Sequence, residues 1–146
     1  MKIFLDTSAL VKLFHEEPGT REVTRLVGAA GAEVFVLELA RLEFFSAIHR
    51  RLRSKELGEN DVVRLLELLD QQLLVFRVLP LGHAVLREAE LLMTAYGPQD
   101  GLRTLDALHL AAFNLLGDTS CTFVCADDRL LDIVRKMGFD AVNPGK

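Results

Sequence analysis

The chain has 146 residues, half of them hydrophobic, with few glycines and prolines, and its formal net charge is −4. This composition predicts one globular domain over residues 1–146 and excludes a fibrous or disordered chain. The negative charge argues against non-specific nucleic-acid binding but does not exclude a nuclease, because acidic catalytic residues lower the total.

Short apolar runs alternate with helical patterns along the whole chain. In the first half of the chain we expect a strand at 3–5, a helix opened by Asp6, Thr7 and Ser8, a helix at 20–28, a strand at 33–37 and a long helix at 38–54. A helix capped by Asn60 at 60–74, a strand at 75–79 and a helix at 82–96 stopped by Gly97-Pro98 should follow. The last elements expected are a buried helix at 104–116, a strand at 122–125, a helix opened by Asp127 and a strand at 141–142. This alternation predicts an α/β sandwich around a parallel sheet.

No apolar run reaches the roughly 20 residues of a membrane span, and the first residues do not form a signal peptide. We therefore expect a cytoplasmic protein without membrane contact. Cys121 and Cys125 stand four residues apart in a predicted strand, which separates their Cα atoms by about 13 Å, too far for a disulfide. We expect two reduced thiols and no metal site formed by them.

Two predicted helices carry unusual surfaces. Basic side chains collect on and directly after the helix at 38–54: Arg41, Arg50, Arg51, Arg53 and Lys55. They form either a solvated helix face or a surface that attracts phosphate. The helix at 60–74 has more apolar residues than one face presents. These either pack internally or form a self-association or partner surface.

Four acidic residues stand in otherwise apolar surroundings: Asp6, Glu43, Asp106 and Asp127. Each has a structural explanation, since Asp6 and Asp127 can cap helices, Asp106 can interact with a helix dipole, and Glu43 can be exposed or ion-paired. Burying an ionised carboxylate nevertheless costs several kcal/mol unless it is paired or binds a metal. Together the four acids favour a shared site for one or two Mg²⁺ or Mn²⁺ ions, which activate water and offset charge on a phosphate.

The stretches around these acids resemble the motifs of PIN-domain ribonucleases. The opening Ile-Phe-Leu-Asp-Thr-Ser-Ala-Leu-Val-Lys-Leu-Phe is similar to the start of the family. Ala-Arg-Leu-Glu-Phe-Phe-Ser-Ala-Ile-His-Arg resembles its second acidic motif, Leu-Arg-Thr-Leu-Asp-Ala-Leu-His-Leu-Ala-Ala its third, and Phe-Val-Cys-Ala-Asp-Asp-Arg-Leu-Leu its fourth. The order and spacing agree over nearly the whole chain, which resembles a VapC-type toxin of a type II toxin–antitoxin pair.

The resemblance implies a PIN-like three-layer α/β/α sandwich with a central, mostly parallel sheet of about five strands. It implies that Asp6, Glu43, Asp106 and Asp127 form a Mg²⁺ or Mn²⁺ site that cuts single-stranded or loop RNA with a metal-activated water. It also implies a homodimer and an antitoxin partner whose C-terminal segment covers the acidic groove.

Several neighbouring residues take their expected roles from the same resemblance. Ser8, or else Thr7, is expected to support the first acid. Asp127 fits the Asp-x-x-Leu register of the family, which leaves Asp128 as the reserve for the fourth acid. His109 matches a position usually filled by His, where packing or hydrogen bonding is commoner than action as a base. Candidates for phosphate contact are Lys12, Arg50 and Arg103.

Three other functions stay open on the sequence alone. One is a housekeeping PIN ribonuclease without an antitoxin, which differs in role but not in chemistry. Another is a non-catalytic module that binds RNA or protein. The third is aspartyl phosphotransfer with Asp6 as the nucleophile, as in haloacid-dehalogenase-like phosphatases, which Ser8 disfavours because it replaces the second Asp of their Asp-x-Asp opening.

Overall fold

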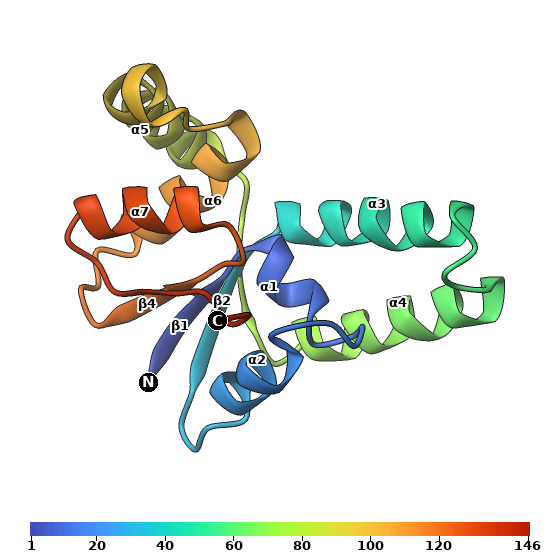
Figure 1. Ribbon diagram of the computed structural model, residues 1–146. Helices are drawn as coiled ribbons and strands as arrows, with labels where there is room; N and C mark the ends of the chain where they lie inside the picture. The colour runs from blue at the N-terminus through green and yellow to red at the C-terminus, as the bar shows by residue number, and fades with distance from the viewer.

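A five-stranded sheet forms the centre of the computed structural model, which describes residues 1–146 (Figure 1). Its strands are β1 (Lys2–Leu5), β2 (Glu33–Leu37), β3 (Arg77–Leu79), β4 (Cys121–Val124) and β5 (Ala141–Val142), in the spatial order β3-β2-β1-β4-β5. Every neighbouring pair is parallel. The predicted sheet of about five strands is confirmed, and it is parallel throughout.

Seven helices cover the two faces of this sheet: α1 (Thr7–Val11), α2 (Thr20–Val27), α3 (Leu39–Arg53), α4 (Glu59–Leu73), α5 (His83–Asp100), α6 (Thr104–Leu115) and α7 (Asp128–Lys136). One buried apolar cluster joins α1 to α4 to one face, and another joins α5, α6 and α7 to the opposite face. In Figure 1, α3 and α4 run side by side away from the sheet. The predicted α/β/α sandwich is therefore confirmed.

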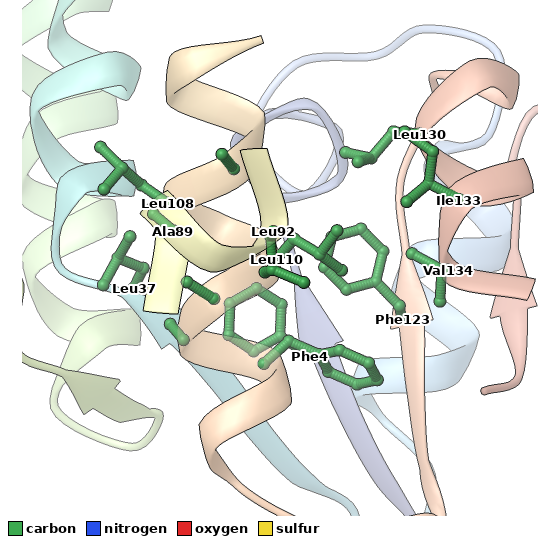
Figure 2. Packing of buried hydrophobic residues seen from close by; sticks show 14 of the residues in the cluster. Phe4, Leu37, Ala89, Leu92, Leu108, Leu110, Phe123, Leu130, Ile133 and Val134 are labelled. Atoms are coloured by element: carbon green, nitrogen blue, oxygen red, sulfur yellow. The ribbon is translucent and has the colours of Figure 1, made fainter. Parts of the chain in front are cut away.

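The two cores follow from the alternation of side chains along β1. Ile3 and Leu5 point into the cluster under α1 to α4, whereas Phe4 points into the other. Figure 2 shows Phe4 beside Phe123 of β4, and their rings stack with centroids 5.4 Å apart. Each buried phenylalanine stabilises the fold by about 1.5–3 kcal/mol. Apolar packing on both faces of the sheet therefore holds β1 in place, and with it the position of Asp6, which follows β1.

Three element boundaries differ from the predictions, and the first is the strand expected at 75–79, which covers only Arg77–Leu79. The helix expected to stop at Gly97-Pro98 continues to Asp100, with Pro98 in its last turn, and Gly101 in the left-handed conformation (φ 68°) follows its end. A proline there lacks the N–H for one helical hydrogen bond, but its φ suits a helix. The cap of α4 is Gly58, whose N–H donates to the Asp61 carboxylate at 2.8 Å, so the prediction of Asn60 as the cap is wrong.

The apolar excess predicted on residues 60–74 divides between the core and the surface. Val62, Leu65 and Leu69 are buried in the core, whereas Val63 and Leu74 are well exposed. Internal packing therefore explains part of the excess and leaves an apolar surface on α4. None of the helices combines the length and the apolar run that crossing a bilayer requires.

Both cysteines are free and buried, which confirms the prediction of two thiols without a mutual disulfide. Burial raises the pKa of Cys121 to about 11 and also raises the pKa of Cys125. Neither thiol is therefore activated as a nucleophile at neutral pH.

Candidate active site

The strand order reverses between β1 and β4. The chain leaves β1 for β2 and β3 on one side and returns much later as β4 on the other. Open parallel sheets bind ligands at such a point, beyond the carboxyl ends of the strands. Asp6 follows β1 directly, and its N–H donates to the carbonyl oxygen of Val124 in β4 at 3.2 Å. The two strands are neighbours, and they bring Asp6 and Asp127 to one edge of the sheet.

Asp6 is buried, with 6% of its surface exposed. Its Oδ1 accepts hydrogen bonds from the Ser8 hydroxyl at 2.6 Å and from the Ala9 N–H at 3.0 Å, so it is also the N-cap of α1. The Ser8 hydroxyl oxygen accepts from the N–H of Ala126 at 3.0 Å and thereby joins the segments that follow β1 and β4. Burial raises the pKa of Asp6, although the Ser8 hydrogen bond opposes this rise. A cation beside this carboxylate would offset the cost of burying its charge.

Asp106 and Asp127 line one small hollow together with Arg103 and Arg129. Burial, followed by the negative charges of Asp6 and Asp127, raises the pKa of Asp106. Asp6 and Asp127 are thus close enough to Asp106 to destabilise its charge. Asp127 is also the N-cap of α7, because its Oδ1 accepts from the N–H of Arg129 at 2.9 Å.

The neighbouring acid, Asp128, is directed elsewhere. Its Oδ1 accepts from the Asn143 amide at 2.8 Å, and its Oδ2 pairs with the ammonium of Lys146. These hydrogen bonds lower the pKa of Asp128, first through Lys146 and then through Asn143. Asp128 therefore lies in an ion pair with the C-terminal segment and does not line the hollow that holds Asp106 and Asp127.

Glu43 on α3 is linked to the edge of the sheet that carries Asp6, because two side chains there form hydrogen bonds with its Oε1. The Thr7 hydroxyl donates to Glu43 Oε1 at 2.7 Å, and His109 Nε2 lies 2.5 Å from that oxygen. The other ring nitrogen of His109, Nδ1, is buried without a hydrogen-bond partner. The proton therefore belongs on Nε2, which donates to Glu43. Burial by itself would raise the pKa of Glu43, but the hydrogen bonds from His109 and Thr7 outweigh it and lower the pKa.

A larger open hollow of about 470 Å³ lies on the α3 side of the acids. Thr7, Ser8 and Glu43 line one part of it, and Lys12, Glu17, Arg50 and Arg51 line another. The Lys12 ammonium, expected to contact phosphate, instead donates to Glu17 Oε1 at 2.9 Å and to the Pro18 carbonyl at 2.8 Å. Arg50 and Arg103, the other two candidates, have no ion-pair partner.

Sequence reasoning did not single out Arg129, which has no ion-pair partner either and lines the hollow of Asp106 and Asp127. Its only signal in the sequence was its position in the first turn of the helix that Asp127 opens. A Cβ on Gly101 would come within 2.9 Å of its guanidinium, so the glycine leaves the space in which Arg129 lies.

The donor set suits a hard cation, because every candidate ligand is a carboxylate or hydroxyl oxygen. No three His, Cys, Asp or Glu side chains converge tightly enough to bind a metal ion by themselves. Mg²⁺ commonly binds through one or two carboxylates and keeps several waters, so a loose group of acids fits it. Burial, followed by the charges of Asp6 and Asp127, raises the pKa of Asp106, and a cation beside this carboxylate would offset both effects.

A model of the PIN domain family matches residues 3–136. The chain belongs to the PIN domain family. A relative of this PIN domain, Ribonuclease VapC47 of Mycobacterium tuberculosis (strain CDC 1551 / Oshkosh), is 35% identical over 147 residues, which cover 98% of this chain and 97% of the relative.

Solved structures share the fold at lower identity. VapC20 of Mycobacterium tuberculosis, described as a sarcin–ricin loop cleaving toxin, is 19% identical to this PIN domain, with a TM-score of 0.68 over 97% of this chain and 99% of that one. A toxin–antitoxin complex from Klebsiella pneumoniae is 15% identical, with a TM-score of 0.68 over 97% of each chain.

Proposed function

We propose that this PIN domain is a metal-dependent endoribonuclease and the toxin of a toxin–antitoxin pair, with residues 1–146 acting as one nuclease domain. The observation that carries the proposal is the group of carboxylates beyond the carboxyl ends of β1 and β4, where the Asp6 N–H donates to the Val124 carbonyl and where Asp106 and Asp127 line one hollow. The 35% identity to a ribonuclease over nearly the full chain supports the reaction. The match to a PIN domain family model weighs against aspartyl phosphotransfer.

Asp6, Asp106, Asp127 and Glu43 are the proposed ligands of Mg²⁺ or Mn²⁺. Such an ion, when bound, activates a water for in-line attack and offsets the charge that develops on the phosphate oxygens. We assign the fourth position to Asp127 rather than Asp128, because only Asp127 lies in the hollow with Asp106. Ser8 supports the first ligand through its hydrogen bond to Asp6 Oδ1.

Thr7 and His109 are positioning residues in this proposal. Both bind Glu43 Oε1, which fixes the orientation of the carboxylate and leaves Oε2 for the ion or for one of its waters. His109 does not act as a base, because Nε2 is used as a donor and Nδ1 is enclosed in the core. Outer hydrogen bonds of this kind typically change metal affinity or activity by about 10–100-fold.

The substrate is proposed to be RNA whose phosphates contact arginines on both sides of the acids. Arg50 borders the larger hollow, whereas Arg103 and Arg129 border the smaller one. All three guanidinium groups are free to bind phosphate, which arginine contacts with two parallel hydrogen bonds. A single strand can follow this path, whereas the unpaired bases needed for recognition are hidden in a regular duplex.

An antitoxin and a second copy of the chain are the proposed protein partners, and the cytoplasm is the proposed location. The structural likeness to a toxin–antitoxin complex supports the first. Val63 on α4 and Leu74, which directly follows this helix, supply exposed apolar side chains for one of these contacts. A housekeeping ribonuclease would share the chemistry but lack the antitoxin, so co-purification of a small inhibitory protein from the native host distinguishes the two roles.

The proposal is tested by cleavage of a mixed RNA panel by metal-free protein, with and without added Mg²⁺ or Mn²⁺, beside the Asp6→Asn variant. We expect cleavage that requires metal and is lost in the variant. Folded protein that neither binds Mn²⁺ nor cleaves any RNA would exclude the nuclease and favour the non-catalytic binding module.

A further inference from the structure

A cluster of partly buried charges lies in the larger hollow and takes no part in the proposed mechanism. Lys12, at the C-terminal end of α1, is only 8% exposed. Its ammonium donates to Glu17 Oε1 at 2.9 Å, and the other carboxylate oxygen of Glu17 lies 3.4 Å from Nη2 of Arg51 on α3. One carboxylate therefore lies between two cations, in the hollow that Thr7, Ser8 and Glu43 also line.

The basic side of this hollow has more positive than negative charge. Arg50 lies beside Arg51 and has no ion-pair partner, and the second partner of Arg51, Glu56, is 3.9 Å away. A lysine buried to this degree needs an anion close to its ammonium, because an unpaired buried charge costs several kcal/mol. Glu17 supplies that anion in the free protein. A phosphate diester, whose single negative charge is shared by two non-bridging oxygens, can accept hydrogen bonds from the same two cations.

Glu17 can leave its position without a change in the backbone. Its N–H donates to the Thr20 hydroxyl at 3.0 Å, and its carbonyl accepts from the Thr20 N–H, so the turn before α2 is fixed. The side chain borders two hollows: the one with Lys12 and Arg51, and an open one that includes Arg21. Arg21 has no ion-pair partner. A rotation of the Glu17 side chain would turn its carboxylate away from Lys12 and Arg51 toward the hollow that includes Arg21.

We propose that Lys12 and Arg51 form a binding site for a backbone phosphate of the substrate, and that Glu17 occupies this site until the substrate displaces it toward Arg21. The identity of the substrate as RNA rests on the proposed function. A phosphate that binds to an unoccupied basic site displaces counterions from solution. A phosphate that binds here displaces the Glu17 carboxylate instead. The affinity of the protein for RNA is therefore lower, and less dependent on salt, than its basic residues by themselves predict.

The test is RNA binding without cleavage, measured by fluorescence anisotropy in EDTA with an end-labelled, mixed-sequence RNA oligonucleotide. Glu17→Gln keeps an oxygen that can accept from Lys12 but removes the charge. We expect it to lower the dissociation constant about threefold or more. We expect the logarithmic salt dependence to steepen by about 0.7, the value for one added phosphate contact on a single strand.

Glu90→Gln is the matched control. Glu90 pairs with Arg87 on the exposed surface of α5, so the variant has the same net charge but leaves the hollow intact. We expect its affinity and salt dependence to stay near those of wild type. Adding Lys12→Gln to Glu17→Gln should remove the gain in affinity, because it removes one of the two cations.

The proposal is overturned if Glu17→Gln binds RNA no more tightly than Glu90→Gln while its circular dichroism spectrum matches wild type. If Glu17→Gln does not fold, Arg51→Gln gives the second test: weaker binding with a shallower salt dependence supports the site, and unchanged binding refutes it. These results do not depend on cleavage. Loss of the phosphate site is therefore distinguishable from failure of the proposed function, which wild-type protein with Mn²⁺ reports directly.

Discussion

Replacing His109 with leucine separates the stability of the fold from the arrangement of the site. The N–H of His109 donates to the Glu43 carboxylate, and a hydrogen bond to a charged group stabilises by about 1.5–3 kcal/mol. The same ring buries Nδ1 without a partner, which costs about 1–3 kcal/mol. Leucine removes both contributions and fills a position next to Phe4, whose ring centroid lies 6.5 Å from that of His109. The two changes largely cancel, so we expect the free energy of unfolding to stay within about 1.5 kcal/mol of wild type.

The site should respond differently. Without His109, Glu43 keeps only the Thr7 hydroxyl as a donor, and we expect Mn²⁺ affinity and RNA cleavage to fall about 10–100-fold. The assays are urea unfolding in EDTA, calorimetric Mn²⁺ titration and cleavage at saturating Mn²⁺. His109→Gln, which places an amide N–H near the position of Nε2, should recover most of the Mn²⁺ affinity. Unchanged Mn²⁺ affinity in His109→Leu, or a loss of stability above about 3 kcal/mol, would refute the reasoning.

Three further predictions concern the acids and Ser8. Asp127→Asn keeps the α7 cap, because Asn caps a helix as well as Asp does, but it should lower the rate of RNA cleavage at least about 100-fold. Asp128→Asn should leave the rate near wild type. The reverse result would assign the fourth acid to Asp128. The raised pKa of Asp106 means that this carboxyl binds a proton more readily in the folded than in the unfolded protein, so its contribution to the stability of metal-free protein should be lost as the pH rises above about 4. Thermal melts in EDTA should show a smaller fall for Asp106→Asn, and equal falls would contradict this assignment. Ser8→Ala removes the hydroxyl that joins Asp6 to the N–H of Ala126, and we expect chemical unfolding to show a loss of about 1–3 kcal/mol.

The part of the site that follows the strands could be predicted from local sequence. Asp6 comes directly after an apolar run that can only be a strand, and Asp127 stands in the same relation to β4 apart from a short turn. Because the sheet is parallel, both acids had to reach the same edge once the strands were neighbours. The sequence did not establish that the strands are neighbours, and the structure shows it through the parallel pairing of β1 with β4 and the backbone hydrogen bond between Asp6 and Val124.

The contacts between helices could not be read in this way. The local pattern of α3 also allowed an exposed or ion-paired Glu43, and only the resemblance assigned it to the shared site. In the structure it is half-buried against Thr7 of α1 and His109 of α6, segments far apart in the sequence. Such a contact depends on how helices pack across the sheet edge, which helical periodicity does not specify. Lys12 shows the same limitation, since a basic residue near the acids indicated phosphate contact but not its partner Glu17.

The strand order also has a consequence for the synthesis of the chain. One side of β1 stays unpaired until β4 joins it, and β4 begins at Cys121, late in the sequence. Asp127 follows β4, so the last of the four acids reaches the others only after most of the chain has left the ribosome. A nascent chain therefore has no complete set of carboxylates. If the chain cuts RNA as proposed, it cannot do so while it is still being synthesised. The messenger RNA and the ribosome that produce it are therefore not exposed to its activity during its own synthesis.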